Sequence, residues 1–324
     1  MSNHTENRKE RFQKHEMLIS CIIPSFNEEA VIEPFLRALH LHLSHYHIPF
    51  EIIIVDDGSS DKTYSLLLAN AGELNIKVIR FSRNFGKESA LTAGLQHCCG
   101  DVAILMDCDF QHPLEVLDTF LEKWVDGHDM VYGVQTDRKH ESFFKRAFTQ
   151  VFYRIMHRMT KTNIPPNAGD FRLLDKKVVK ALLQLPEKSR FMKGLYAWVG
   201  FSSFAVPFEA PQRSAGKSAW NFSRLAELAL TGITAFSDVP LRIWGFIGLI
   251  ISVISFSYGL LIILDTLLYG VDVPGYATLV VAIMFFGGIQ LLSIGILGEY
   301  IGRIFTEVKN RPNYIIEHKV GFEE

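Results

Sequence analysis

The sequence of 324 residues is poor in cysteine, with only Cys21, Cys98, Cys99 and Cys108. Their spacing matches neither a zinc site nor a disulfide framework, so we expect a protein of a reducing compartment. The chain also lacks a basic surplus, because 33 Lys and Arg are offset by 35 Asp and Glu. The formal net charge of -2 argues against a nucleic-acid-binding protein.

Residues 1–16 contain no apolar stretch of the kind found in a cleaved signal peptide. We expect them to form a polar N-terminal tail that stays in the cytosol with the domain that follows. The chain shows no internal repeat and no low-complexity tract, and its length suggests about two domains.

Long uncharged runs occur only late in the chain, at residues 243–264 and 276–297. A helix of either run would be about 33 Å long, enough to cross a hydrocarbon core of about 30 Å. We therefore predict a transmembrane hairpin of two helices within residues 241–305. The alternative is a pair of buried helices in a large soluble domain.

Positive charges flank the outer ends of these two runs. Arg242 precedes the first run, and Arg303, Lys309 and Arg311 follow the second, whereas the connector 265–275 contains no Lys or Arg. The positive-inside rule then predicts a multi-pass protein with both termini and the domain before the hairpin in the cytoplasm. Because such short anchors often pack against copies of themselves, we also expect a homo-oligomer.

The first 135 or so residues alternate short apolar runs with amphipathic segments, which is typical of an α/β fold with a parallel sheet. The expected strands cover residues 18–24, 51–55, 77–81, 102–106 and 130–134, and the expected helices begin near Glu28, Asp61, Lys87 and Pro113. Polar clusters follow the first four strands, at residues 25–29, 56–61, 83–87 and 107–111. Ligands of such sheets bind at the carboxyl ends of the strands, so we expect these clusters to converge on one crevice.

Two segments between the sheet and the hairpin have the character of interfacial helices. Residues 143–159 mix aromatic with basic side chains, which is typical of an amphipathic helix on a membrane surface. A helix packed on the sheet with a solvated basic face is the alternative. Residues 222–236 form a second apolar-rich segment, which would lead into the membrane.

Asp107 and Asp109 follow the expected strand 102–106 directly, with Gln111 two residues later. Two carboxylates separated by one residue can share a divalent cation that neutralises a departing diphosphate. The pattern alone is common in solvated turns. Asp56 and Asp57 are expected in the same crevice, however, and such a gathering of like charges is costly without a cation or another ligand.

Several motifs resemble those of a known enzyme family. The segments PSFNEE (24–29), VDDGSSD (55–61) and DCDFQ (107–111) resemble the inverting family 2 glycosyltransferases of GT-A fold. The segments SRNFGKE (82–88), GDFRL (169–173) and LGEYIGR (297–303) are similar to the polyprenyl-phosphate, or bactoprenol, glucosyltransferases within that family. The resemblance covers nearly the whole chain except its first 16 residues.

The resemblance implies a membrane-anchored α/β enzyme. Its parts would be a polar tail (1–16), a cytoplasmic GT-A domain with a parallel-rich sheet (17–220), an interfacial helix (221–240), the transmembrane hairpin (241–305) and a cytoplasmic tail (306–324). The partners it implies are a UDP-sugar donor, a polyprenyl phosphate acceptor and the bilayer of the inner membrane.

The resemblance also implies a donor site. Its residues would be Pro24, Asn27, Glu28, Asp56, Asp57, Arg83, Lys87 and Asp107. In this site Asp56 would accept a hydrogen bond from the nucleobase, and Arg83 and Lys87 would meet phosphate charge. Lys87 could equally pair with Glu88 or a nearby Asp.

A divalent cation is implied beside the donor site. Asp107, Asp109 and Gln111 would hold Mg²⁺ or Mn²⁺, since oxygen ligands suit these ions. Gln111 has the alternative of being a polar residue at a helix N-terminus.

Asp170 and Asp109 are the catalytic residues that the resemblance implies, with Asp170 beside the acceptor. A lipid monophosphate has a second pKa of about 6 and is mostly a dianion at neutral pH, so Asp170 would orient more than deprotonate it. A turn Asp paired with Arg172 is the alternative. The residues expected at the acceptor or diphosphate are Arg138, Arg172, Arg213, Lys217 and Ser218.

The reaction expected from this resemblance is inverting transfer of a hexose, glucose from UDP-glucose, to undecaprenyl phosphate on the cytoplasmic face, for modification of a cell-envelope glycan. Another sugar, such as mannose, N-acetylglucosamine or an aminoarabinose derivative, or a dolichyl acceptor would give a related enzyme. A silent membrane scaffold or nucleotide sensor is the alternative outside enzymes, but Asp109 and Asp170 are both present. The chain has no Gln-x-x-Arg-Trp motif, which argues against a processive synthase.

Overall fold

The computed structural model describes most of the chain. The described residues are 2–136, 168–188, 190–209 and 275–322, with scattered positions between 246 and 268. The predicted interfacial helices at 143–159 and 222–236 lie outside them. The described chain belongs to two units, one of Met1–Glu227 with Arg311–Glu324 and one of Leu228–Asn310.

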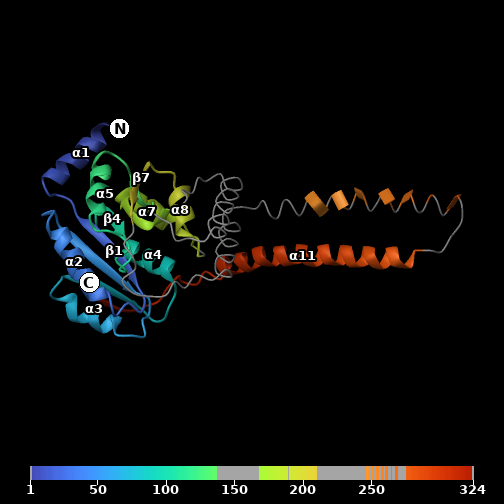
Figure 1. The fold of residues 1–324 in the computed structure, drawn as a ribbon, viewed down its shortest axis with the longest axis horizontal. Coiled ribbons are helices and arrows are strands. Elements are labelled where there is room, and N and C mark those ends of the chain that lie inside the picture. Colours follow the sequence, from blue (N-terminus) through green and yellow to red (C-terminus); the bar gives the residue numbers. More distant parts are fainter. Residues whose placement is uncertain are drawn as a thin grey trace. The chain divides into compact units, whose positions relative to one another are not determined.

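An eight-stranded mixed sheet forms the centre of the first unit, in the order β7-β5-β6-β4-β1-β2-β3-β8 (Figure 1). Its central parallel strands are β1 (Ile19–Ser25), β2 (Phe50–Asp56), β3 (Ile76–Phe81) and β4 (Val102–Leu105). The outer strands are β5 (Met130–Gln135), β6 (Ala168–Asp175), β7 (Ser203–Phe208) and β8 (Ile316–Val320). β6 runs antiparallel to β4 and β5, and β8 runs antiparallel to β3. The predicted α/β class is confirmed, and each of the five predicted strands ends within one residue of an observed one.

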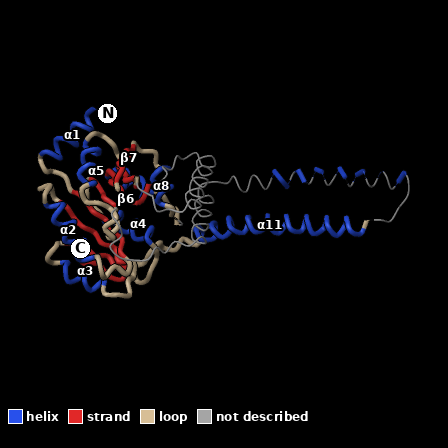
Figure 2. Tube along the Cα trace, viewed as in Figure 1, coloured by secondary structure: helices blue, strands red, loops and turns tan. Residues whose placement is uncertain are grey.

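Helices cover both faces of this sheet (Figure 2). The helices that connect the strands from β1 to β5 are α2 (Ile32–Ser44), α3 (Thr63–Ala71), α4 (Lys87–His97) and α5 (Val116–Val125). The shorter α7 (Lys176–Gln184) and α8 (Met192–Trp198) follow β6. The four predicted helices are present, and α2 begins four residues after Glu28.

The alternation of side chains along the strands divides the core into two layers. Ile52 and Ile54 of β2 pack in the layer that contains α2 and α5, whereas Ile53 and Val55 pack against α4. α4 approaches β1 so closely that a Cβ at Gly94 would lie 2.2 Å from Ile22. Glycine at this position therefore lets the helix that begins at Lys87 sit directly on the sheet.

Of the two segments predicted as tails, residues 1–16 and residues 311–324 are part of the first unit. Residues 1–16 contain α1 (Ser2–Gln13), whose Arg8 pairs with Asp129 and Asp175 at 2.8 Å each. The Arg8 guanidinium also lies over the Trp124 ring, 5.0 Å from its centre. Residues 306–324 contain β8, which adds an edge strand beside β3. Long-range ion pairs and strand pairing therefore tie parts of both segments to the sheet domain.

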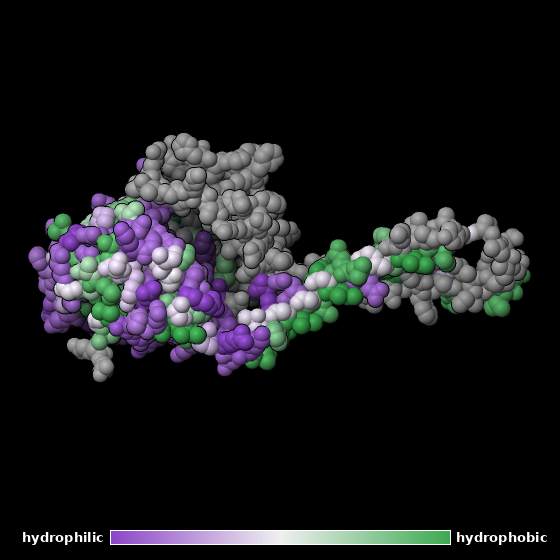
Figure 3. All heavy atoms as spheres, turned by 90° about the horizontal axis from the view of Figure 1, so that it is seen from below, coloured by the Kyte–Doolittle hydropathy of each residue, from purple (hydrophilic) through white to green (hydrophobic). Residues whose placement is uncertain are grey.

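In the second unit, α11 (Tyr276–Val308) is a helix of 33 residues that includes the second predicted span. Among the described residues one segment, Phe285–Val308, is long and apolar enough to cross a membrane. Figure 3 shows hydrophobic side chains gathered along it, and Leu291 is 72% exposed. Arg303 pairs with Glu299 one turn away, at 3.1 Å. The first predicted span, 243–264, lies largely outside the described residues.

We predict that Arg8→Ala lowers the free energy of unfolding by about 2–3 kcal/mol, because it leaves the buried carboxylate of Asp129 and the half-buried carboxylate of Asp175 without this cation. The melting temperature of the full chain in detergent should fall by several degrees, about 2–4 °C for each kcal/mol. Lys14→Ala is the control, since its pair with Glu10 is more than half exposed and should contribute less than about 1 kcal/mol. Equal melting temperatures of the two variants would contradict the role of Arg8.

Candidate functional site

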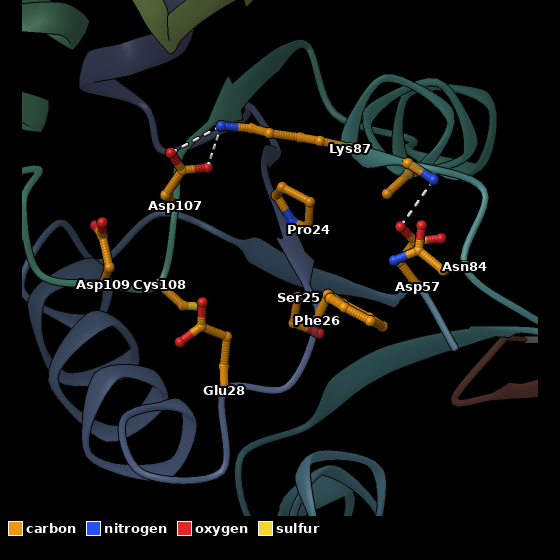
Figure 4. Close-up of a pocket in the computed structure, with 12 residues that line it drawn as sticks. Pro24, Ser25, Phe26, Glu28, Asp57, Asn84, Lys87, Asp107, Cys108 and Asp109 are labelled. Atoms are coloured by element: carbon orange, nitrogen blue, oxygen red, sulfur yellow. Dashed lines mark hydrogen bonds and ion pairs between the residues drawn. The ribbon is translucent and has the colours of Figure 1, made fainter. Parts of the chain in front are cut away.

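The carboxyl ends of the parallel strands and the start of α4 surround a cavity of about 320 Å³ (Figure 4). Its lining residues are Pro24, Ser25, Phe26, Glu28, Asp57, Asn84, Gly86, Lys87, Ala90, Asp107, Cys108 and Asp109. The structure thus brings together residues from all four polar clusters that follow the predicted strands. Six of the predicted donor and metal residues are among them.

The loop after β1 is fastened to the loop after β2 by hydrogen bonds. The backbone N–H of Asn27 donates to Ser59 Oγ (2.9 Å), and the side-chain oxygen of Asn27 accepts from the N–H of Ser60 (2.9 Å). The N–H of Glu28 donates to Thr63 Oγ1 (2.8 Å). Asn27 adopts a φ of 56°, which asparagine tolerates. Asn27 therefore shapes the loop, and its neighbour Glu28 lines the cavity.

Asp57 ties the loop after β2 to the loop after β3. Its carboxylate accepts the backbone N–H groups of Phe85 (2.6 Å) and Gly86 (2.9 Å). The two loops touch at Gly58, where a Cβ would lie 2.5 Å from the backbone of Arg83. The Arg83 guanidinium lies over the Phe85 ring at 4.0 Å, and Arg83 is not a lining residue. Burial raises the pKa of Asp57 in spite of its two N–H donors.

Asp56 is completely buried and lies beside a cation that the sequence analysis did not identify. Its Oδ1 accepts the N–H of Ser59 (3.2 Å), while Oδ2 has no hydrogen-bond partner in the described part of the chain. Arg80 Nε lies 3.7 Å from Oδ2 and 3.2 Å from a carboxylate oxygen of Glu317 in β8. The Arg80 guanidinium lies over the Tyr64 ring at 4.2 Å. Burial raises the pKa of Asp56.

Lys87 joins the two predicted catalytic regions. Its Nζ lies 2.6 Å from Asp107 Oδ1 and 3.3 Å from Asp170 Oδ2, so pairing with a nearby Asp is the arrangement observed. Burial opposes the charged form of Lys87, but both carboxylates outweigh it and raise the Lys87 pKa. Burial likewise opposes an ionised Asp170, and Lys87, Lys193 and Arg172 together hold the pKa of Asp170 below its ordinary value.

The predicted metal ligands lie in the loop after β4. Asp107 and Asp109 line the cavity, and Asp109 Oδ1 accepts the backbone N–H of Gln111 at 3.0 Å. Phe110, between Asp109 and Gln111, has a φ of 59°, a left-handed conformation that is rare for a bulky residue. No group of three or more His, Cys, Asp or Glu side chains arranged for a metal ion occurs within the described residues. The oxygens of this loop are nevertheless the donors that a hard divalent cation prefers.

His112 supports this loop and was missed by the sequence analysis. Its Nδ1 accepts the backbone N–H of Asp107 at 3.1 Å, and its ring stacks on Phe171. Burial lowers the pKa of His112, which favours the neutral ring that such an acceptor needs.

Two further residues missed by the sequence analysis lie close to Asp170. Tyr196 of α8 is 1% exposed, and its hydroxyl has no hydrogen-bond partner within the described residues. Glu88 of α4 has its pKa raised to about 8, first by burial and then by the negative charge of Asp170. No local motif distinguishes Tyr196, because α8 reaches the site only through the tertiary fold, whereas Glu88 lies in the segment SRNFGKE (82–88) without having been expected in the site.

Arg172 is not among the lining residues of the cavity, and its contact with the acceptor or diphosphate stays a prediction. It is 2% exposed, its Nε donates to the carbonyl of Gly169 (2.9 Å), and its guanidinium lies over the rings of Tyr196 (4.2 Å) and Tyr132 (5.2 Å). Asp170 pairs with Lys87 at 3.3 Å, and the charge of Arg172 also contributes to lowering the pKa of Asp170. Arg138, Arg213, Lys217 and Ser218 lie outside the described residues.

Residues 20–183 match Glycosyl transferase family 2, and residues 239–304 match the GtrB C-terminal hairpin. The chain belongs to glycosyl transferase family 2. It is therefore a transferase by family, and the GT-A-like fold agrees with that assignment. The hairpin match and the one apolar helix of spanning length described above indicate an association with membranes.

This family 2 member is similar to proteins of known and unknown activity. It is 46% identical to the SfII prophage-derived bactoprenol glucosyl transferase of Shigella flexneri, over 93% of this chain and 98% of that protein. It is also 46% identical to an uncharacterized glycosyltransferase of Synechocystis, over 94% of this chain and 96% of that protein. Among solved structures, glucosyl-3-phosphoglycerate synthase from Mycobacterium tuberculosis is 17% identical, with a TM-score of 0.46 over 69% of this chain and 80% of that chain.

The raised pKa of Glu88 predicts a pH-dependent stability. Because the folded chain holds this proton more tightly than the unfolded chain, the free energy of unfolding should fall as the pH rises from about 4.5 towards about 8. Glu88→Gln removes this loss. The difference in the free energy of unfolding between the variant and the natural chain should shift by at least about 1 kcal/mol in favour of the variant as the pH rises from 5 to 8.5. Thermal unfolding at each pH measures this difference.

Glu122→Gln is the matched control for Glu88→Gln, because the Glu122 side chain is 66% exposed. Its stability should follow that of the natural chain at every pH. Parallel curves for Glu88→Gln and the natural chain would contradict the buried, protonated state of Glu88.

Proposed function

We propose that this glycosyltransferase transfers glucose from UDP-glucose to a polyprenyl phosphate, with inversion at the anomeric carbon. The observation that carries the proposal is the pairing of Lys87 with both Asp107 and Asp170 beside a cavity at the carboxyl ends of the sheet. Through Lys87, the Asp107 carboxylate on the donor side lies within a few ångströms of the Asp170 carboxylate, which is expected to face the acceptor. The bactoprenol glucosyl transferases among its relatives support the choice of glucose and of a polyprenyl carrier.

The nucleotide would bind at the β1 and β2 end of the cavity. The buried Oδ2 of Asp56, which lies 3.7 Å from Arg80 Nε and has no hydrogen-bond partner among the described residues, would accept a hydrogen bond from the uracil imide N–H. Pro24 and Glu28 would form the opposite wall, with Asn27 holding the shape of that loop. A carboxylate acceptor at this point favours uracil over a base that presents only acceptors there.

Asp107, Asp109 and Gln111 would hold Mg²⁺ or Mn²⁺, because their oxygens match the preference of hard divalent cations. A cation bound there would neutralise charge on the departing diphosphate. The ammonium group of Lys87 already lies against Asp107, so this carboxylate is placed where positive charge is stabilised.

In the transfer step, an oxygen of the lipid phosphate forms a bond to the anomeric carbon while the bond from that carbon to the UDP oxygen breaks. The electron pair of the broken bond leaves with UDP. The phosphate is mostly a dianion at neutral pH and needs no base. Asp170, kept ionised by neighbouring cations, would orient the acceptor and hold Lys87 towards the diphosphate. Positioning and electrostatics would supply most of the acceleration.

The membrane anchor explains how a lipid becomes the acceptor. We infer a hairpin of two spans in the inner membrane, with the catalytic domain and both termini in the cytoplasm, so that the phosphate head group reaches the enzyme while its tail stays in the bilayer. The residues expected to meet that head group include Arg213, Lys217 and Ser218. Packing between hairpins would make the enzyme a homo-oligomer.

The donor is tested with purified enzyme, Mg²⁺, undecaprenyl phosphate and radiolabelled UDP-glucose, UDP-N-acetylglucosamine or GDP-mannose. We expect label in the organic phase from UDP-glucose alone. Label from another donor would revise the sugar, and transfer only with dolichyl phosphate would revise the carrier. No transfer from any donor would support a membrane scaffold or nucleotide sensor instead.

We predict that Asp109→Asn and Asp170→Asn each lower kcat by about 100-fold or more, since each removes a charge that acts on the reacting groups. Asp170→Asn should leave the affinity for UDP nearly unchanged, whereas Asp109→Asn should also abolish the response to Mg²⁺. Asp126→Asn is the control, because this exposed carboxylate directly after α5 pairs only with Lys123 in the described structure. Full activity of Asp109→Asn would remove the metal assignment.

A further inference from the structure

The His112 ring connects the loop after β4 to β6, the strand that contains Asp170. Its Nδ1 accepts the backbone N–H of Asp107 at 3.1 Å. Its ring stacks on Phe171, the neighbour of Asp170, with centroids 4.5 Å apart and planes inclined by 9°. One imidazole therefore contacts both regions that Lys87 joins. It accepts a hydrogen bond from the backbone of Asp107, and its aromatic face lies on the neighbour of Asp170.

The stack has little freedom to shift. Phe171 is 1% exposed and is held by Phe120 and by the edge of Phe208, with ring centroids 4.7 and 5.7 Å away. Phe208 also meets the His112 ring edge-on at 6.1 Å. Beneath the rings, a Cβ at Gly133 would lie 2.7 Å from Phe208 and 2.9 Å from Phe171. Protein interiors of this density transmit displacement, so a change in the stack would move β6 or the loop.

A second connection between the same two regions runs through charge. Lys87 joins the side chains of Asp107 and Asp170, at 2.6 and 3.3 Å. An incoming cation and diphosphate would compete for these charged groups, because both interact with carboxylates or ammonium groups. The His112 connection uses the backbone of Asp107 and an apolar face, so donor binding leaves its groups untouched.

We propose that His112 is a positioning residue that holds the Asp107–Asp109 loop at a fixed spacing from Asp170 while the donor is bound. This inference rests on the proposed function. The acceptor role requires an unprotonated Nδ1, and therefore a proton on Nε2. Because the spacing matters for the transfer step, its loss should lower kcat while donor affinity is kept.

Three substitutions separate the two contacts of the ring. His112→Asn places an acceptor near the position of Nδ1, His112→Gln places one near Nε2, and His112→Phe keeps the aromatic face without any acceptor. We expect His112→Gln and His112→Phe to lower kcat by about 100-fold, as a misplacement of about 1 Å does. His112→Asn should lose less than about 10-fold, and all three should bind Mn²⁺ and UDP within about threefold of the natural chain.

Calorimetric titration with Mn²⁺ and UDP provides the readout that does not depend on transfer, and thermal unfolding reports folding of each variant. Gly133→Ala disturbs the stack from the other side and keeps the hydrogen bond to His112, so it should lower kcat by no more than His112→Asn does, with Mn²⁺ and UDP binding kept. This variant also keeps the test open where a His112 variant fails to fold.

The proposal is overturned by unchanged kcat in His112→Gln and His112→Phe, or by equal losses in the Asn and Gln variants. It is equally overturned by a fall in UDP affinity that accounts for the whole effect, since His112 would then serve donor binding. Failure of the proposed function appears differently, as absence of lipid transfer by the natural chain. In that case the same variants are compared by their release of glucose from UDP-glucose to water.

Discussion

The site depends on one compensation of charge, the contact of the Lys87 ammonium group with Asp107 and Asp170. Two carboxylates placed this close would repel each other strongly in a partly buried site, and one of them would take up a proton. The cation compensates both charges, and it helps to hold the pKa of Asp170 below its ordinary value. Lys87 reaches them because α4 begins at this residue, directly after a loop that Asp57 holds through two backbone N–H groups.

Much of the fold could be predicted from the sequence because its signals are local. Apolar runs identify the five strands, and the polar residues that follow these runs identify the loops that meet at one cavity. The neighbours of a side chain, by contrast, depend on segments that are distant in the sequence. Asp170 and Arg172 lie two residues apart and therefore on the same face of β6, but α8 packs over Arg172 through Tyr196 and leaves Asp170 beside Lys87.

Contacts between distant segments account for what the sequence did not reveal. Phe171 is 59 residues from His112 in the chain, and Glu317 lies more than 200 residues from Arg80. Neither pair has a spacing that a motif would capture. The helical state of residues 2–13 was missed for a similar reason, because its polar sequence is stabilised by Arg8 reaching acidic partners far along the chain.

The position of β8 has a consequence for biosynthesis. This strand borders β3, beside the arginine that faces Asp56, and yet it is encoded after the hydrophobic hairpin. A ribosome therefore delivers the final piece of the sheet only after the whole anchor has been synthesised. Until then β3 presents an unpaired edge, the kind of surface that invites association with other chains. Completion of the sheet beside Arg80 and Asp56 is thus tied to completion of the polypeptide.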